Sequence, residues 1–273
     1  MLLQVNNSFA QNLAVGIFFA ALVAYLSLKA KFLTKSGGAA TFILASLIFG
    51  LGGIKWSVPI LTFFVLSSIL SKLRKSRNSQ VETYFEKSGV RDYLQVIANG
   101  GLGGVLVIAD FVNPDELYFL IYVSMLAAVC ADTWATEIGT WKKTATYNIL
   151  NLRQVEQGVS GGISLIGTIG SAAGSLTIAL SGIFWIDFAV HQYLLLILTA
   201  GLLGSMFDSF LGATIQAQNK CVVCKKVTEK KLHCGKETKH NSGNVWISND
   251  VVNLLCGISG GIIVIILKEI AKA

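Results

Sequence analysis

Cys130-Ala131-Asp132-Thr133-Trp134-Ala135-Thr136-Glu137-Ile138-Gly139 is the stretch of sequence that decides the fold. It ends an apolar run that begins at Leu117, and a run of this length predicts a helix that crosses a membrane. Asp132 and Glu137 place two carboxylates in that helix. Because an ionised group in hydrocarbon is expensive, acids inside such a helix indicate a functional site.

The composition of the whole chain agrees with a membrane protein. Of its 273 residues, 53% are hydrophobic and only 14% are charged. Soluble proteins contain about 25% charged residues, so the composition excludes an ordinary soluble enzyme. We therefore expect an all-α, polytopic transmembrane helix bundle that forms a single integral membrane domain over residues 1–273.

The apolar pattern predicts about eight transmembrane helices. The second and third are separated by so few residues that we expect them to form a tight hairpin. The predicted helices span residues 12–28, 37–54, 57–71, 95–111, 117–139, 160–183, 190–215 and 247–267.

The basic residues predict the orientation of the bundle. All but three of the 22 Lys and Arg residues fall in the alternating loops that follow the first, third, fifth and seventh predicted helices. Loops rich in Lys and Arg stay in the cytoplasm, so the pattern predicts that the N-terminus lies on the outer side of the cell membrane. The same sorting explains the net charge of +7 without a nucleic-acid partner. The exceptions are Lys55, Lys268 and Lys272.

Polar and glycine-rich sequence gathers at the helix ends that this topology brings to the cytoplasmic face. Five helix ends contribute, which scattered polar residues would not do. The candidate site residues are Asn99, Asp132, Thr133, Thr136, Glu137, Ser160, Gly161, Gly162, Ser164, Asp208, Ser209, Asn249, Asp250 and Asn253.

The acids among these residues are candidates for a magnesium site. Asp132 and Glu137 lie about 140° apart around their helix and can border one groove. Carboxylate oxygens suit Mg²⁺, which often bridges to substrate phosphates. We expect Asp132, Glu137 and Asp208 to be the catalytic residues and, with Asp250, the Mg²⁺ ligands. The alternatives are that the helix-end acids are merely solvated and that Asn249 is a plain helix cap.

The glycine-rich segment around Gly161 is a candidate phosphate site. We expect Ser160, Gly161, Gly162 and Ser164 to open a helix, and free backbone N–H groups at a helix start attract phosphate. No P-loop is present, because the Lys that should follow the glycines is missing.

The chain also has a candidate internal repeat. Residues 95–139 and residues 160–215 each begin with a glycine-rich helix start and end in a helix that contains an aspartate. This similarity predicts a parallel internal repeat.

The seventh loop differs in chemistry from the others. Residues 218–246 contain Cys221, Cys224 and Cys234, together with His233 and His240. A Cys-x-x-Cys followed by further Cys and His indicates a structural zinc site. The three cysteines with His240, or with His233, would supply its four ligands.

Several of these motifs, taken together, resemble one known family. Asp132 to Gly139, the glycine segment 158–164, Asp208-Ser209, the Cys-x-x-Cys loop and Asn249-Asp250 with Asn253 are similar, in the same order, to the family of phytyl-phosphate kinase and transmembrane protein 19. The resemblance implies a prenyl-phosphate kinase that transfers a phosphoryl group from a nucleoside triphosphate, typically CTP, to phytyl phosphate. In that scheme Lys142 or Lys143 could neutralise the phosphates of the donor.

Two other classes of protein share some of these features. A secondary transporter of a small anionic or lipid-linked substrate would also have an internal repeat, buried acids and interrupted helices. Transporter sites lie near the membrane midplane, whereas the polar residues here are expected at one face. A membrane scaffold without activity leaves the clustered acids unexplained.

Overall fold

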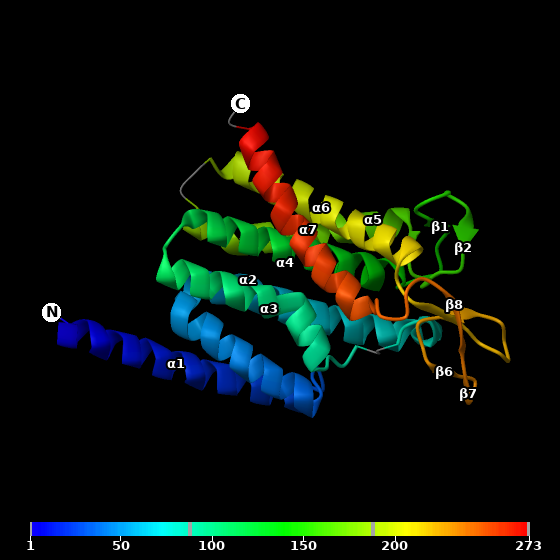
Figure 1. Cartoon of the computed structure of the whole chain (residues 1–273), viewed down its shortest axis with the longest axis horizontal. Coiled ribbons are helices and arrows are strands. Elements are labelled where there is room, and N and C mark those ends of the chain that lie inside the picture. Colours follow the sequence, from blue (N-terminus) through cyan, green and yellow to red (C-terminus); the bar gives the residue numbers. More distant parts are fainter. Residues whose placement is uncertain (1, 87–88, 187–188, 272–273) are drawn as a thin grey trace.

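A computed structural model describes residues 2–86, 89–186 and 189–271 of the chain (Figure 1). Within these ranges seven α-helices are long and apolar enough to cross a membrane, which confirms the predicted all-α polytopic bundle. They are α1 (Leu2–Lys29), α2 (Lys35–Arg77), α3 (Tyr93–Val112), α4 (Glu116–Gly139), α5 (Leu165–Gly182), α6 (Val190–Thr214) and α7 (Asn249–Ile270).

Helix α2 turns back on itself at Gly53, whose backbone has φ 60° and ψ −153°. A Cβ placed on Gly100 of α3 would lie 3.0 Å from Leu44 and 3.1 Å from Ile60, which belong to opposite arms of α2. In an uninterrupted helix those two residues would be about 24 Å apart. The two arms are therefore antiparallel, which confirms the predicted hairpin. With α2 counted as two arms, the described residues contain eight apolar helical segments.

Helix α4 lies at the centre of the bundle (Figure 1). In its apolar window 61% of the residues are buried, compared with 22% in α1, α2 and α3. Glycines let α5 approach it closely: a Cβ on Gly170 would lie 2.7 Å from the carbonyl oxygen of Trp134, and one on Gly174 would lie 2.8 Å from that of Cys130. Small residues at such contacts allow close helix packing in lipid.

An aromatic cluster fills the end of the bundle at which α4 begins. The rings of Trp56 and Phe119 lie 5.5 Å apart, and those of Trp56 and Tyr122 lie 4.7 Å apart. The buried Tyr122 hydroxyl donates a 2.7 Å hydrogen bond to the carbonyl oxygen of Trp56. The core at this end of α4 is therefore tightly packed and aromatic, whereas Asp132 and Glu137 lie near the other end of the helix.

The loops at the polar end contain short strands and one 3₁₀ helix, and a second 3₁₀ helix follows α5 at the opposite end of the bundle. Strands β2, β1 and β3 form one antiparallel sheet, β5, β4 and β8 form a second, and β6 pairs with β7. The strands are β1 (Thr146–Asn148), β2 (Gln154–Val155), β3 (Gly162–Ile163), β4 (Gln218–Lys220), β5 (Val227–Thr228), β6 (Leu232–His233), β7 (Lys236–Glu237) and β8 (Lys239–Ser242), and the 3₁₀ helices are η1 (Ser79–Thr83) and η2 (Ile183–Trp185).

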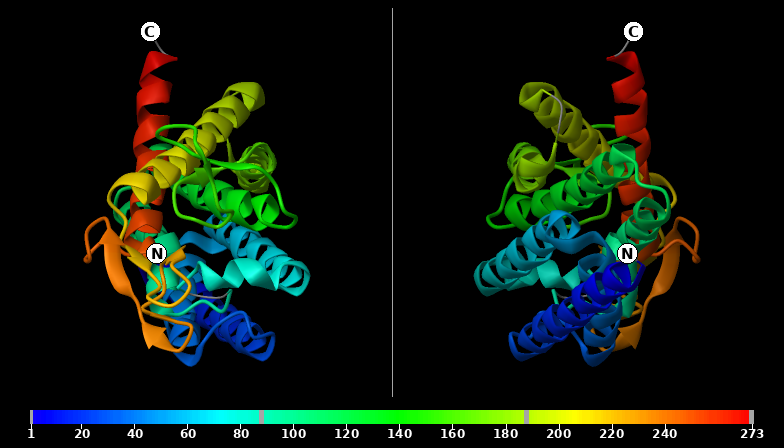
Figure 2. Two further views of the ribbon diagram at one scale, coloured as in Figure 1. Left: turned by 90° about the vertical axis from the view of Figure 1, so that its right-hand side faces the viewer. Right: turned by 90° about the vertical axis from the view of Figure 1, so that its left-hand side faces the viewer.

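The four basic loops lie together at this end of the molecule. The backbone N–H of Arg91 donates to Phe32, and that of Glu229 donates to Tyr84, at 2.9 Å each. The Ser160 hydroxyl donates to Glu229 at 2.8 Å, which joins the fifth and seventh loops. The first residues of α1 and the last residues of α7 lie at the opposite end (Figures 1 and 2).

Two predicted helix starts are wrong. Helix α5 begins at Leu165 after the cap Ser164, so Ser160, Gly161 and Gly162 lie in the preceding turn and strand instead of opening a helix. Gly161 has φ 81°, which is incompatible with a right-handed helix at that residue. Helix α3 begins at Tyr93, so Asn99 lies in its second turn.

We expect Gly53→Ala to destabilise the protein, because residues with a side chain rarely adopt the backbone conformation at this turn. Such strain costs roughly 1–3 kcal/mol, although the added methyl group itself would meet no atom within 4 Å. Thermal unfolding of the purified protein in detergent should show a lower midpoint. The control is Gly101→Ala, where the new methyl group would meet only the Ile97 side chain of the same helix, at 3.2 Å. Equal midpoints for the two variants would contradict the role given to Gly53.

Candidate functional site

One cavity of about 340 Å³ lies at the polar end of the bundle, between the helices and the loops. It collects residues that are distant in sequence. All of the residues predicted for catalysis, magnesium or phosphate binding line it: Asn99, Asp132, Thr133, Thr136, Glu137, Ser160, Gly161, Gly162, Ser164, Asp208, Ser209, Asn249, Asp250 and Asn253.

Three aspartates line this cavity. The carboxyl groups of Asp132 on α4 and Asp208 on α6 are close neighbours. Asp208 is only 8% exposed, and its Oδ2 atom has no hydrogen-bond partner in the described part of the chain. Asp250, also 8% exposed, lies in the first turn of α7 and lines the same cavity.

This arrangement has a chemical consequence. Two ionised carboxylates in contact repel each other, and burial strengthens the repulsion, so a shared proton or a cation is needed between them. A set of oxygen donors with a buried, unsatisfied carboxylate oxygen fits a hard cation such as Mg²⁺. The neighbouring carboxylates of Asp132 and Asp208 could hold that ion, and Asp250 lines the same cavity.

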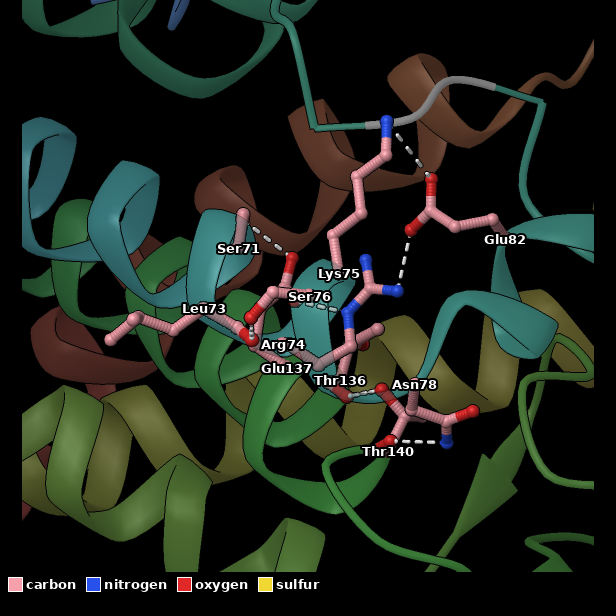
Figure 3. Close-up of polar contacts among 10 residues, drawn as sticks. All are labelled: Ser71, Leu73, Arg74, Lys75, Ser76, Asn78, Glu82, Thr136, Glu137 and Thr140. Atoms are coloured by element: carbon pink, nitrogen blue, oxygen red, sulfur yellow. Dashed lines mark hydrogen bonds and ion pairs between the residues drawn. The ribbon is translucent and has the colours of Figure 1, made fainter.

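Glu137 lines the cavity, but its carboxylate already has partners (Figure 3). The Ser71 hydroxyl donates to Oε1 and the Arg74 Nε–H donates to Oε2, each at 2.6 Å. Arg74 also pairs with Glu82 at 2.5 Å. Because both of its oxygens are engaged, Glu137 is better suited to neutralising the buried Arg74 than to the magnesium role predicted from sequence.

Arg91 supplies a buried cation to the same cavity. It is 7% exposed, donates a hydrogen bond to the Ser68 hydroxyl and lies over the rings of Phe63 and Phe64. Within the described ranges no carboxylate lies within ion-pair distance of it. Burial lowers the pKa of Arg91, and the charge of Glu137 acts in the opposite direction.

Among the described residues, the basic side chains that line the cavity are Arg74 and Arg91. Lys142 and Lys143, which the sequence offered as partners for the donor's phosphates, are not among the lining residues. Because Arg74 is paired with two acids, Arg91 is, within the described ranges, the basic residue of this cavity that can meet an anionic ligand.

Glu229 comes into the site from the seventh loop. Its Oε1 accepts hydrogen bonds from the Ser160 hydroxyl and from the Gln216 amide, at 2.8 Å each, and its side chain lines the cavity. Burial raises the pKa of Glu229, although the hydrogen bonds from Ser160, the Glu86 backbone and Gln216 lower it. Glu229 thus fastens the seventh loop to the glycine segment above the aspartates.

Some of the other predicted site residues form hydrogen bonds within their own helices. The Thr133 hydroxyl donates to the carbonyl oxygen of Val129 at 2.8 Å. The Ser164 hydroxyl accepts the backbone N–H of Gly167 at 3.0 Å and caps α5. Asn249 is the first residue of α7 and follows the cap residue Ser248, so it is not the cap itself. Its neighbour on the same face is Asn253, one turn further along, and both line the cavity.

Sequence reasoning missed Arg91, Glu229 and Gln95, which also line the cavity. The two charged residues lie in loops whose basic character was attributed to topology, and Gln95 lies in the first turn of α3. No local pattern distinguishes them from solvated loop residues. Only the contacts between the loops bring them to the aspartates.

A second cluster lies in the Cys/His loop. The ligand atoms of Cys221, Cys224, His233 and Cys234 all lie within 4.8 Å of one another. Burial raises the pKa of Cys221, but hydrogen bonds from the backbones of Cys224 and Val223 help to lower it to about 6. Three thiols and an imidazole are a donor set typical of structural zinc.

The structure puts His233 in this cluster and leaves His240 outside it. His233 ends β6 immediately before Cys234, whereas His240 lies in β8 and pairs with Asn219 of β4. The choice of His240 from sequence followed ligand spacing alone. The tight turn between β6 and β7 instead places the adjacent residues His233 and Cys234 in the same cluster of ligands.

Comparison with known proteins places the chain among membrane proteins. The family model described as integral membrane protein DUF92 matches residues 18–261. Protein PGR of Arabidopsis thaliana is 31% identical over 267 residues, which cover 89% of this chain and 91% of that protein. An uncharacterized membrane protein of Methanocaldococcus jannaschii is 25% identical over 257 residues, 92% of each chain. Protein VTE6, chloroplastic, of A. thaliana is 23% identical over 242 residues, 87% of this chain and 66% of that protein. No solved structure matches the chain significantly.

We expect the purified protein to contain stoichiometric zinc, measurable by inductively coupled plasma mass spectrometry. Cys221→Ser and His233→Asn should each lower the zinc content, because each removes one ligand of the cluster. His240→Asn is the matched control, since it replaces a histidine of the same loop that lies outside the cluster. Zinc that is lost with His240 and kept with His233 would show that the ligand set is misassigned.

Proposed function

The chain belongs to the DUF92 family of integral membrane proteins, and from that premise we propose that it is a membrane-embedded prenyl-phosphate kinase. It would transfer a phosphoryl group from a nucleoside triphosphate, CTP in this proposal, to a phytyl-like prenyl monophosphate. The observation that carries the proposal is a polar cavity at one end of an apolar bundle, lined both by adjacent carboxylates and by a buried arginine that has no acid partner among the described residues. The motif resemblance to phytyl-phosphate kinase supports the choice of substrate.

The chemistry of the reaction matches the residues present. A phosphate oxygen of the prenyl monophosphate attacks the γ-phosphorus of the nucleotide, and the bond from that phosphorus to the bridging oxygen breaks. The products are a prenyl diphosphate and a nucleoside diphosphate. The attacking oxygen is already anionic, so no strong general base is needed. Catalysis of this kind depends mainly on positioning and on neutralising charge.

The residues of the cavity can be divided between the two substrates. Asp132, Asp208 and Asp250 would hold Mg²⁺, which neutralises the charge of the transferring phosphates when it is bound. Backbone groups of residues 160–162 and the amides of Asn249 and Asn253 would orient the nucleotide. These groups lie together because Glu229 ties the glycine segment to the seventh loop.

The arrangement of the loops supports a cytoplasmic position for the cavity. The loops that surround it carry most of the basic residues, and such loops stay on the cytoplasmic side. A nucleotide would reach the site from that compartment. The position of the cavity beside the loops also favours an enzyme over a transporter, whose binding site would be expected near the membrane midplane.

We expect Asp132→Asn to abolish the kinase activity without unfolding the protein. Removal of one preorganised charge from a phosphoryl-transfer site lowers the rate by roughly 10²-fold or more. Purified protein is incubated with labelled CTP, Mg²⁺ and a panel of prenyl monophosphates, and the diphosphate is separated by chromatography. The matched control is Glu116→Gln, an exposed acid in the first turn of the same helix. A folded wild-type protein that gives no diphosphate with any acceptor would refute the kinase proposal.

We expect different effects from the two cavity acids Asp208 and Glu137. Asp208→Asn should raise the Mg²⁺ concentration needed for half-maximal activity, because it removes a ligand charge. Glu137→Gln should lower the thermal unfolding midpoint, because Arg74 loses a charged partner in a buried site. Its Mg²⁺ dependence should change little. A Mg²⁺ requirement that shifts with Glu137→Gln and not with Asp208→Asn would show that the ligands are assigned to the wrong acids.

A further inference from the structure

A second, apolar groove lies beside the polar cavity. It is lined by Val23 of α1, by side chains from both arms of α2, and by Val96 and Gly100 of α3. The lining side chains from α2 include Leu44, Ala45, Ile60, Phe63 and Phe64. Thr41, Phe49 and Leu61, which also line it, are partly exposed on the surface of the bundle. A chain lying in this groove can therefore continue into the surrounding lipid.

The groove and the polar cavity meet at three residues. Arg91, Gln95 and Asn99 line both of them. Arg91 lies over Phe63 and Phe64, with its guanidinium carbon 5.8 and 5.6 Å from the two ring centres. The guanidinium that lines the polar cavity therefore also lines the apolar groove.

Gln95 and Asn99 extend this junction along one face of α3. They are four residues apart, and Gln95 Oε1 and Asn99 Oδ1 are buried without a hydrogen-bond partner in the part of the chain that is described. Buried amide groups normally have partners, so two unsatisfied ones beside a buried cation point to a polar ligand. Either end of an amide can face that ligand, since the assignment of its oxygen and nitrogen can be exchanged.

The backbone of Arg91 is held rigidly. Its N–H donates to Phe32, its carbonyl oxygen accepts from Thr34, and it forms a parallel bridge with Leu33. The start of α2 packs so closely against it that any Cβ on Gly37 would collide with the carbonyl oxygen of Arg91. The guanidinium therefore has a fixed origin from which to meet an anion at the junction.

We propose that the apolar groove between the arms of α2 and α3 binds the prenyl chain of the acceptor and that Arg91, with Gln95 and Asn99, binds its phosphate. This inference rests on the proposed kinase function and identifies the acceptor half of the site. Arg91 lines the same cavity as the aspartates, so an acceptor phosphate held by the guanidinium lies in the space that the metal-binding acids also line. Charge complementarity selects a phosphate head, and the continuous apolar lining selects a hydrocarbon tail.

The size of the groove limits what it can recognise. It encloses only about 60 Å³, so it holds the carbons nearest the phosphate, and the rest of the tail lies against lipid. The site therefore distinguishes acceptors by the first part of their chain and by their head group. It does not measure their total length.

The test measures binding of labelled farnesyl monophosphate to the full chain in lipid nanodiscs, without nucleotide or Mg²⁺. Ala45→Phe fills the groove and Arg91→Gln removes the cation, and each should weaken binding by about tenfold or more. Ala45→Leu adds less volume and should give a smaller loss. The matched controls are Ile43→Phe, on the exposed face of the same helix, and Arg153→Gln, an exposed basic residue that lines neither space.

Farnesol and phosphatidic acid separate the two parts of the site and its two sources of phosphate. Farnesol binding should fall in Ala45→Phe and persist in Arg91→Gln, and its persistence also shows that the Arg91 variant is folded. Phosphatidic acid should compete poorly with farnesyl monophosphate. Equal competition would assign the groove to a membrane phospholipid and overturn the proposal. So would unchanged farnesyl monophosphate binding in both Ala45→Phe and Arg91→Gln.

The binding results are independent of the kinase proposal. If no diphosphate forms in the kinase assay but the variants lose binding as expected, the reaction is misassigned and the lipid-phosphate site stands. If diphosphate forms and Ala45→Phe uses farnesyl monophosphate as well as the wild type does, the groove assignment fails while the kinase stands.

Discussion

A charge inside an apolar bundle has to be met by another charge, and this constraint governs the end of α4. Its acids lie in the helix that neighbouring helices bury most, so they have limited contact with bulk water. Glu137 is met by Arg74, and the result is a buried contact between α2 and α4. Asp132 is met instead by another acid, Asp208, and that pair needs a shared proton or a bound cation. One helix end thus contains an internal ion pair and an acid pair that a proton or a cation can stabilise.

The aspartate pair can be held close because the surrounding helices approach α4 through small residues. Gly170 and Gly174 bring α5 against its backbone, and Gly204 of α6 leaves so little room that a Cβ there would lie 2.5 Å from Ala128. Such spacing fixes α6, and with it Asp208, relative to Asp132. The aromatic cluster at the opposite end of α4 stabilises the same geometry. The site therefore depends on packing along the whole length of the helix.

Much of the fold could be predicted because membrane segments obey simple rules of length and charge. The hairpin at Gly53 and the gathering of Asp132, Asp208 and Asp250 at one end followed from segment lengths and the distribution of Lys and Arg. The start at residue 160 was wrong because a glycine with positive φ is indistinguishable, in sequence, from a helical glycine. Arg91 and Glu229 were not identified from the sequence, because contacts between loops bring them to the cavity and no local pattern encodes such contacts. The proposed parallel repeat remains a prediction.

In the proposed kinase reaction, the charged residues that line the cavity would bring two phosphates together despite their mutual repulsion. Each anionic substrate needs its own positive partner, and the partners have to lie on different sides of the reacting atoms. The aspartates can provide one only by binding a metal ion, whereas Arg91 provides the other permanently. The acceptor half of such a site would be preformed, and the donor half would assemble with the ion that the nucleotide brings. A lipid acceptor that diffuses in the membrane could therefore be held before the nucleotide arrives from water.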